Sequence, residues 1–320
     1  MESARRGRNG IVVIGTVFVD VKGYPDSRYI PGGRNAGRVV QVHGGVSRNV
    51  AEDIANVELR PTFISVVTDD GTGRDVVDKL ERHKVRTEYL RYAPEGTGIW
   101  LAVFDNSGDV VASISKRPDV RAIAEVLDER GDEIFAEADS IAVEVDMDDD
   151  ILKRIFRLAE KYGKHVYGLV SNMTIAIERR DLLRYTSCFV CNQQEAGLLF
   201  SEDYTDCSPK EMAALLAERI QDGQIPQMVV TMGAQGAVYA SMDGTFGCVP
   251  TVKVDVVDTT GCGDAFFAGM CIGLTYGKGL EEACRIGVRM ASSVVATREN
   301  VTPRFLPAEF GLEGSGEEEV

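Results

Sequence analysis

Residues 256–269, VVDTTGCGDAFFAG, place glycines and an aspartate directly before an apolar helical pattern. Gly261 and Gly263 let the backbone fold tightly, so that several amide groups can point at one spot. At a helix start these amides have no intrahelical partner and the helix dipole adds positive charge, which suits a phosphate. The carboxylate of Asp264 would repel that phosphate. Its place beside the phosphate is explained if it accepts a proton from the group that attacks the phosphate. The segment therefore predicts phosphoryl chemistry, although a capped strand–helix junction would explain the same glycines.

Asn192 and Glu195 lie one helical turn apart in the stretch NQQE, which follows an apolar run. Oxygen ligands at this spacing suit Mg²⁺, which usually keeps several waters. The alternative is an N-capping asparagine with a solvent-facing glutamate.

The stretch TMGAQG, residues 231–236, follows the next apolar run with a backbone that a nucleotide could approach closely. The alternative is a hairpin, because the residues that follow resemble a returning strand. The two interpretations are compatible.

Two polar features stand near the beginning of the chain. The stretch GGVSRN, residues 44–49, precedes an amphipathic helical pattern, and its alternative explanation is a turn with Ser47 as N-cap. Asp20 is the acidic residue of an apolar run just past the first predicted strand. A polyol ligand or a local hydrogen bond would satisfy this carboxylate.

The segments that must position these residues alternate between strand and helix. Residues 151–163 carry apolar side chains on one helical face, and Ser208 precedes a second helical pattern as N-cap with Glu211 as its capping-box partner. This alternation predicts an α/β fold with a mainly parallel sheet covered on both faces. The predicted strands are the short apolar runs at 11–15, 62–67, 140–145, 165–170, 187–192 and 227–233.

Two stretches break the alternation and predict a small separate β-sheet, a lid over the main one. Residues 17–43 are rich in Gly, Pro and Arg, and residues 97–115 indicate a hairpin that turns at 106–108. We expect a single α/β domain over residues 10–312, a disordered N-terminus over 1–9 and an acidic tail over 313–320. The open edges of a lid sheet could be covered by a second copy, which would make a homodimer.

Composition excludes several classes of protein. The 320 residues carry a net charge of −15, which argues against a nucleic-acid groove or an anionic membrane surface as partner. Seven cysteines without disulfide-scaffold spacing indicate reduced thiols, and no stretch has the character of a signal peptide or membrane span. We therefore expect a cytoplasmic protein that acts on a small molecule.

The segment VVDTTGCGDAFFAG resembles the carboxy-terminal signature of the ribokinase/PfkB family of carbohydrate kinases. GGVSRNVAE, NQQE and TMGAQG follow the order of the family's other landmarks. The resemblance implies a ribokinase-like three-layer sandwich with a mainly parallel central sheet and a small β-sheet lid. It also implies an ATP-dependent kinase that transfers the γ-phosphate to a primary hydroxyl of a sugar or ribosyl compound.

The resemblance assigns roles by position. Asp264 would be the general base, and the amides of Gly261, Cys262, Gly263 and Asp264 would form the anion hole. Cys262, where the family usually has alanine, would add an oxidisable thiol near the phosphates. Asn192 and Glu195 would organise Mg²⁺ through water. The remaining assignments are Thr231, Gly233, Gly236 and Thr260 for ATP, Asp20, Gly44, Gly45, Asn49 and Glu144 for the sugar, and Asp258 for a monovalent cation such as K⁺.

The acceptor stays open between two ribosyl compounds. GGVSRN differs from the GGKGAN pattern of ribokinases and is similar to that of pseudouridine kinases, whereas Glu144 resembles the ribose-contacting acid of ribokinases. A pseudouridine-like nucleoside and free ribose are therefore both candidates. The alternatives are a hexose or sugar-acid kinase of the same family and a non-catalytic regulator that binds nucleotide or sugar.

Overall fold

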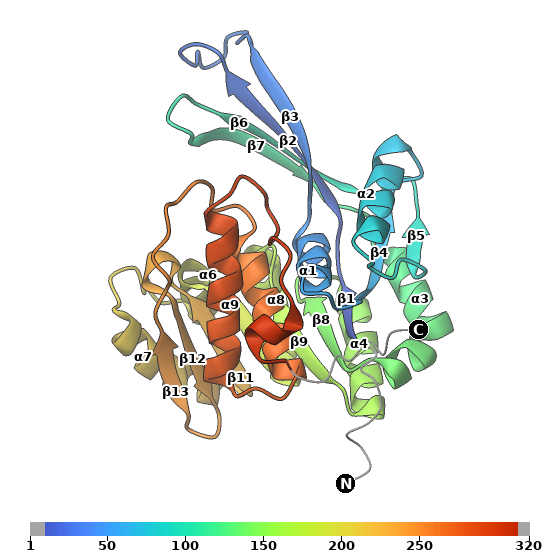
Figure 1. Ribbon diagram of the computed structural model, residues 1–320, viewed down its shortest axis with the longest axis vertical. Coiled ribbons are helices and arrows are strands. Elements are labelled where there is room, and N and C mark those ends of the chain that lie inside the picture. Colours follow the sequence, from blue (N-terminus) through green and yellow to red (C-terminus); the bar gives the residue numbers. More distant parts are fainter. Residues whose placement is uncertain (1–9, 313–320) are drawn as a thin grey trace.

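The computed structural model describes residues 10–312, so the predictions for residues 1–9 and 313–320 lie outside the described residues. Its larger sheet has the strand order β13-β12-β11-β10-β9-β8-β1-β4-β5, in which the neighbours from β11 to β5 are parallel and β12 and β13 are antiparallel (Figure 1). The strands are β1 (Ile11–Ile14), β4 (Thr62–Val67), β5 (Leu90–Tyr92), β8 (Ser140–Glu144), β9 (His165–Leu169), β10 (Cys188–Asn192), β11 (Gln227–Thr231), β12 (Ala237–Ser241) and β13 (Phe246–Val249).

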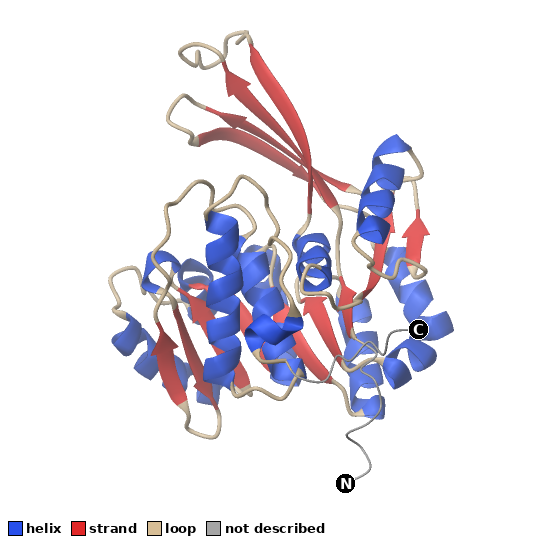
Figure 2. Ribbon diagram, viewed as in Figure 1, coloured by secondary structure: helices blue, strands red, loops and turns tan. Residues whose placement is uncertain are grey.

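Helices cover both faces of this sheet (Figure 2), because successive strand side chains point to opposite faces and both sets are apolar. In β1, Val13 packs into one buried cluster, and Val12 and Ile14 pack into the other. The first cluster contains α1 (Val46–Ala55), α2 (Gly71–Arg82), α8 (Cys262–Thr275) and α9 (Leu280–Val295); the second contains α3 (Arg121–Glu137), α4 (Asp149–Tyr162), α5 (Met173–Ala176), α6 (Gln193–Phe200) and α7 (Pro209–Gly223). Short 3₁₀ segments are η2 (Ile177–Tyr185), η3 (Gly233–Gln235) and η4 (Pro307–Phe310).

The two irregular stretches form the predicted separate sheet. β2 (Phe18–Pro25), β3 (Gly37–Gly44), β6 (Gly98–Phe104) and β7 (Val110–Lys116) pair in the order β3-β2-β6-β7. Figure 1 shows this lid sheet projecting away from the layered body, above α1 and α8. The three-layer sandwich with a β lid is confirmed.

Local sequence signals account for several element ends. Ser208 caps α7 in a capping box with Glu211, and Gly163 ends α4 in the left-handed conformation, as predicted. The alternative role of Ser47 as N-cap of α1 is wrong. Gly45 caps α1 instead, because its φ of 94° suits a residue without a β-carbon. No helix within residues 10–312 combines the length and apolarity needed to span a bilayer.

Candidate active site

The start of α8 lies where two pockets meet. The lid pocket, about 300 Å³, lies beneath the lid sheet and is lined by Asp264 and Gly261, with Thr260 beside them. The side pocket, about 820 Å³, lies beside β11 and is lined by Cys262 and Gly263. One helix terminus therefore lines both pockets.

Gly261 gives this helix start its tight turn. It is the N-cap of α8 with φ of 82°, and a β-carbon there would come within 2.1 Å of the Asn300 carbonyl oxygen. Only glycine fits such a position. A β-carbon on Gly263 would meet no atom within 4 Å, so the helix start is open toward the side pocket. The first-turn amides of α8 therefore lie beside an open pocket, an arrangement that suits an anion.

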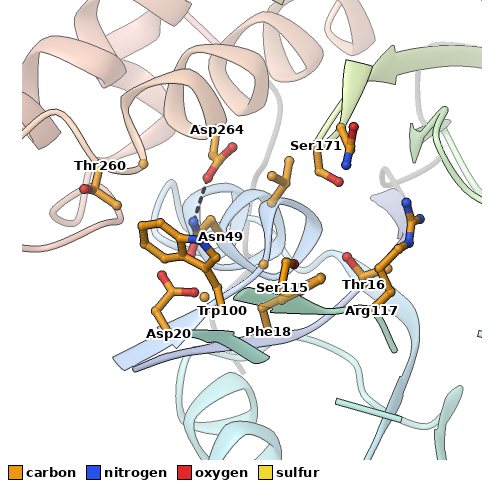
Figure 3. Close-up of a pocket in the computed structure, with 15 residues that line it drawn as sticks. Thr16, Phe18, Asp20, Asn49, Trp100, Ser115, Arg117, Ser171, Thr260 and Asp264 are labelled. Carbon is orange, nitrogen blue, oxygen red and sulfur yellow. Dashed lines mark hydrogen bonds between the residues drawn. The ribbon is translucent and has the colours of Figure 1, made fainter. Parts of the chain in front are cut away.

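Asp264 is partly buried at the first turn of α8, and the Asn49 side-chain amide donates to its carboxylate over 2.6 Å (Figure 3). Burial, together with the charges of Asp20 and Glu195, raises the pKa of Asp264 to about 7, against the lowering effects of Asn49 and Arg48. A carboxylate that titrates near neutral pH is suited to accept a proton from a hydroxyl.

Arg48 holds Asn49 in place, a role that the sequence alone does not reveal. The guanidinium is fully buried and donates to Glu52 over 2.5 Å, to the His43 carbonyl and to Asn49 Oδ1. Because arginine has no acceptor, the Asn49 oxygen must face Arg48, and its NH₂ group then faces Asp264. The sequence does show an arginine and a glutamate four residues apart on the predicted helix, a spacing that allows an ion pair. The structure adds that the helix around this pair is buried.

Glu144 does not line the lid pocket. Its carboxylate is 1% exposed and accepts hydrogen bonds from the Thr16 amide, the Thr16 hydroxyl and the Ser47 amide. Burial and the charge of Asp146 raise the pKa of Glu144. The carboxylate therefore caps α1 from β8, behind the pocket, rather than facing the space where a sugar would lie.

The other residues predicted to bind the sugar come together. Asp20, Gly44, Gly45 and Asn49 all line the lid pocket, and burial raises the pKa of Asp20. The pocket also contains residues that the sequence analysis did not assign to it: Thr16, Phe18, Val46, Trp100, Ser115, Arg117, Ser171 and Asn172. It thus combines a ring of polar groups with two aromatic side chains.

The side pocket brings Thr231, Gly233 and Gly236 together with an apolar wall. The hairpin alternative is also correct, since β12 returns antiparallel to β11. Thr260 lines the lid pocket rather than the side pocket, and its amide donates to Asp258 over 2.8 Å. The apolar wall consists of Val252, Val254, Val256, Phe266, Val288 and Val295.

Asn192 and Glu195 form a reciprocal capping box at the start of α6. Asn192 Oδ1 accepts from the Glu195 amide over 2.9 Å, and Glu195 Oε2 accepts from the Asn192 amide over 2.8 Å. Glu195 is only partly exposed, and burial raises its pKa. This arrangement uses one oxygen of each side chain and leaves Glu195 Oε1 outside the capping box, which fits a Mg²⁺ ion held through water.

The Cys262 thiol is poorly nucleophilic despite its place in the turn. Burial, with the charges of Asp258 and Asp264, raises its pKa to about 11. The thiol therefore stays protonated at neutral pH, which weakens the expectation of ready oxidation.

The chain is similar to several known proteins. The model of the family described as "pfkB family carbohydrate kinase" matches residues 8–305. The chain is 35% identical over 303 residues to a guanosine-inosine kinase of Exiguobacterium acetylicum, covering 94% of this chain and 99% of that one. It is 25% identical to a pseudouridine kinase of Escherichia coli, covering 93% and 94%. An Arabidopsis thaliana ribokinase solved with ribose and ATP has a TM-score of 0.80 at 20% identity, covering 96% and 100%.

Proposed function

The chain belongs to the pfkB family of carbohydrate kinases, and we propose that it transfers the γ-phosphate of ATP to the 5′ hydroxyl of a purine ribonucleoside. Membership makes it a phosphotransferase that acts on a hydroxyl group of a small sugar or nucleoside. The observation that carries the proposal is the start of α8, where the base Asp264 faces the lid pocket and the amides beside it face the side pocket.

The transfer follows from this arrangement. The 5′ hydroxyl lies in the lid pocket beside Asp264, whose ionised carboxylate accepts its proton. The 5′ oxygen attacks the γ-phosphorus, a new oxygen–phosphorus bond forms, and the bond to the β-phosphate oxygen breaks to release ADP. Amides of the first turn of α8 donate hydrogen bonds to the phosphoryl oxygens as their charge changes. Asn49 orients the carboxylate throughout.

The side pocket is the proposed ATP site. Its apolar wall suits the adenine ring, and the adjoining helix start suits the phosphates. Glu195 would hold Mg²⁺ through water, and the ion would neutralise phosphate charge. Asp258 keeps its proposed role as a ligand of a monovalent cation, with one carboxylate oxygen already bonded to the Thr260 amide.

The extent of the lid pocket favours a nucleoside over free ribose. Figure 3 shows Arg117, Ser171 and Thr16 together on the side of the lid pocket away from Asp20 and Thr260, which leaves space for a base. The names of the guanosine-inosine and pseudouridine kinases support the same choice.

ADP release tests this acceptor. With Mg²⁺ and ATP, we expect the purified protein to give its highest kcat/KM with guanosine or inosine, lower values with adenosine and pseudouridine, and the lowest with ribose. Turnover confined to free sugars or phosphorylated hexoses would exclude a nucleoside acceptor. Absence of ADP release with every compound would refute the proposed transfer.

We also propose a homodimer formed through the lid sheet. Trp100 lines the lid pocket, so its neighbours Ile99 and Leu101 point to the outer face, where Ile114 pairs with Leu101. These three side chains are 40%, 40% and 69% exposed. A second copy would bury this apolar face and the sheet edge.

Sedimentation velocity measures the dimer. We expect the wild type to sediment as a dimer and Ile114→Lys to shift it toward monomer, because a buried lysine at the interface would lose its hydration. Leu198→Lys on α6, where Leu198 is 49% exposed, is the matched control and should leave the sedimentation coefficient unchanged. A monomeric wild type would contradict the proposal.

A further inference from the structure

The lid pocket has an end that the phosphoryl transfer does not use. Figure 3 shows Arg117, Ser171 and Thr16 on one side of the pocket, and Asp264 and Thr260 on the other. A nucleoside whose 5′ hydroxyl lies at Asp264 therefore extends its base toward Arg117. The residues at that end decide which base fits.

Within the described residues, Arg117 is held through one nitrogen. It follows β7, and its Nη2 donates to the Asp146 carbonyl over 3.0 Å and lies 3.8 Å from Asp146 Oδ2. Asp146 is 1% exposed and is itself fixed by the Ser171 amide and hydroxyl, over 3.0 Å and 2.8 Å. The Arg117 side chain lines the pocket and is 43% exposed, so a ligand in the pocket can contact it. Asp146 thus fixes the position of the guanidinium, which has five N–H donors and uses one of them in this hydrogen bond.

The chemistry of a guanidinium selects among bases. Arginine only donates hydrogen bonds. A 6-oxopurine presents two adjacent acceptors, O6 and N7, whereas adenine presents N7 beside an amino donor at the 6-position. Two parallel N–H groups match the first edge and oppose the second.

We propose that Arg117 recognises the O6/N7 edge of the base and makes the enzyme selective for 6-oxopurine ribonucleosides over adenosine. The inference rests on the proposed nucleoside kinase function. Arg117 is a specificity residue, aimed by Asp146 and Ser171, and takes no part in moving the phosphoryl group or the proton.

Steady-state kinetics with inosine, guanosine and adenosine test the role of Arg117. Arg117→Met should lower kcat/KM for inosine and guanosine roughly 5- to 150-fold and leave adenosine within about 2-fold, since one bidentate contact is lost. Arg117→Gln should favour adenosine over inosine relative to the wild type, because an amide pairs with the N6/N7 edge of adenine. Arg121→Gln, at an 83% exposed side chain that pairs with Asp119, is the matched control and should keep the wild-type preference.

A substrate analogue tests the same contact without relying on the variants. In the wild type, 7-deazaguanosine lacks the N7 acceptor and should react with a lower kcat/KM than guanosine; in Arg117→Met the two should react alike. Equal losses of kcat/KM for inosine and adenosine in both Arg117 variants would overturn the inference. So would equal kcat/KM for 7-deazaguanosine and guanosine in the wild type. Either result would leave the proposed nucleoside kinase function standing. A wild type that phosphorylates no nucleoside would overturn the proposed function and this inference with it.

Discussion

Asp264→Asn is expected to lower kcat by at least roughly 10²- to 10⁴-fold, the usual contribution of a general base. Asparagine keeps the size of the side chain but does not accept the proton of the 5′ hydroxyl. ATP affinity should hold or increase, because a negative charge next to the phosphates is removed. If Asp264 merely caps α8, asparagine caps about equally well and turnover should survive. Near-normal turnover in the variant would therefore remove Asp264 as the base.

The pH dependence gives a second measure of the same residue. Since the pKa of Asp264 is raised to about 7, the ionised base accumulates as the pH rises, and kcat/KM should increase through about pH 7 and then level off. The residual activity of Asp264→Asn should not show this rise of kcat/KM with pH. If the variant still shows this rise, the titration belongs to another group, such as Glu144, whose pKa is also raised.

Thermal melts are the control for unfolding of the variant. The fold keeps the Asp264 proton up to about pH 7, whereas an unfolded chain loses it near the ordinary pKa of 3.8. Ionisation therefore costs stability increasingly from about pH 4 to pH 7, and the full cost remains above. Asp264→Asn avoids this cost, so its Tm should match the wild type near pH 4 and be higher above pH 7.

Arg48→Met is expected to destabilise the fold by about 3–5 kcal/mol, because Glu52 loses its partner in a fully buried ion pair. Lys79, which lies 3.1 Å from Glu52, still pairs with it, so the loss of stability should lie toward the lower end of this range. Urea unfolding measures this change in the free energy of unfolding. Arg285→Met breaks an exposed pair of the same spacing, with Glu281, and should cost less than about 1 kcal/mol.

The double variant Arg48→Met/Glu52→Leu separates the stability of α1 from the positioning of Asn49. Two apolar side chains should restore most of the stability, since no charge is left buried without a partner. The kcat should still be about 10- to 100-fold below the wild type, because the Asn49 amide is no longer held against Asp264. A double variant with restored stability and wild-type kcat would show that Arg48 has no role in positioning.

The parts of the site that could be predicted from the sequence lie within one continuous segment. Residues 261–264 carry the turn, the amides and the proposed base together, so local chemistry suffices to predict them. Ser208 and Gly163 were predictable for the same reason, since a cap depends on its own few neighbours.

The parts that escaped prediction depend on pairing between distant segments. β8 lies beside β1, which brings Glu144 against Thr16 and Ser47 and away from the pocket. Arg117, which directly follows β7, reaches the pocket because β7 pairs with β6, where Ser115 lies opposite Trp100. No spacing within either segment carries that information, and a lone arginine on a strand end is usually a solvated side chain.

The most direct test of the central claim is the identity of the product formed from guanosine by the wild type with Mg²⁺ and ATP. We expect a phosphorus NMR signal of guanosine 5′-monophosphate, coupled to the protons of the 5′ carbon, appearing in step with ADP, and no such product from 5′-deoxyguanosine. A phosphate attached at the 2′ or 3′ position, or ADP formed equally with 5′-deoxyguanosine, would contradict the placement of the 5′ hydroxyl against Asp264.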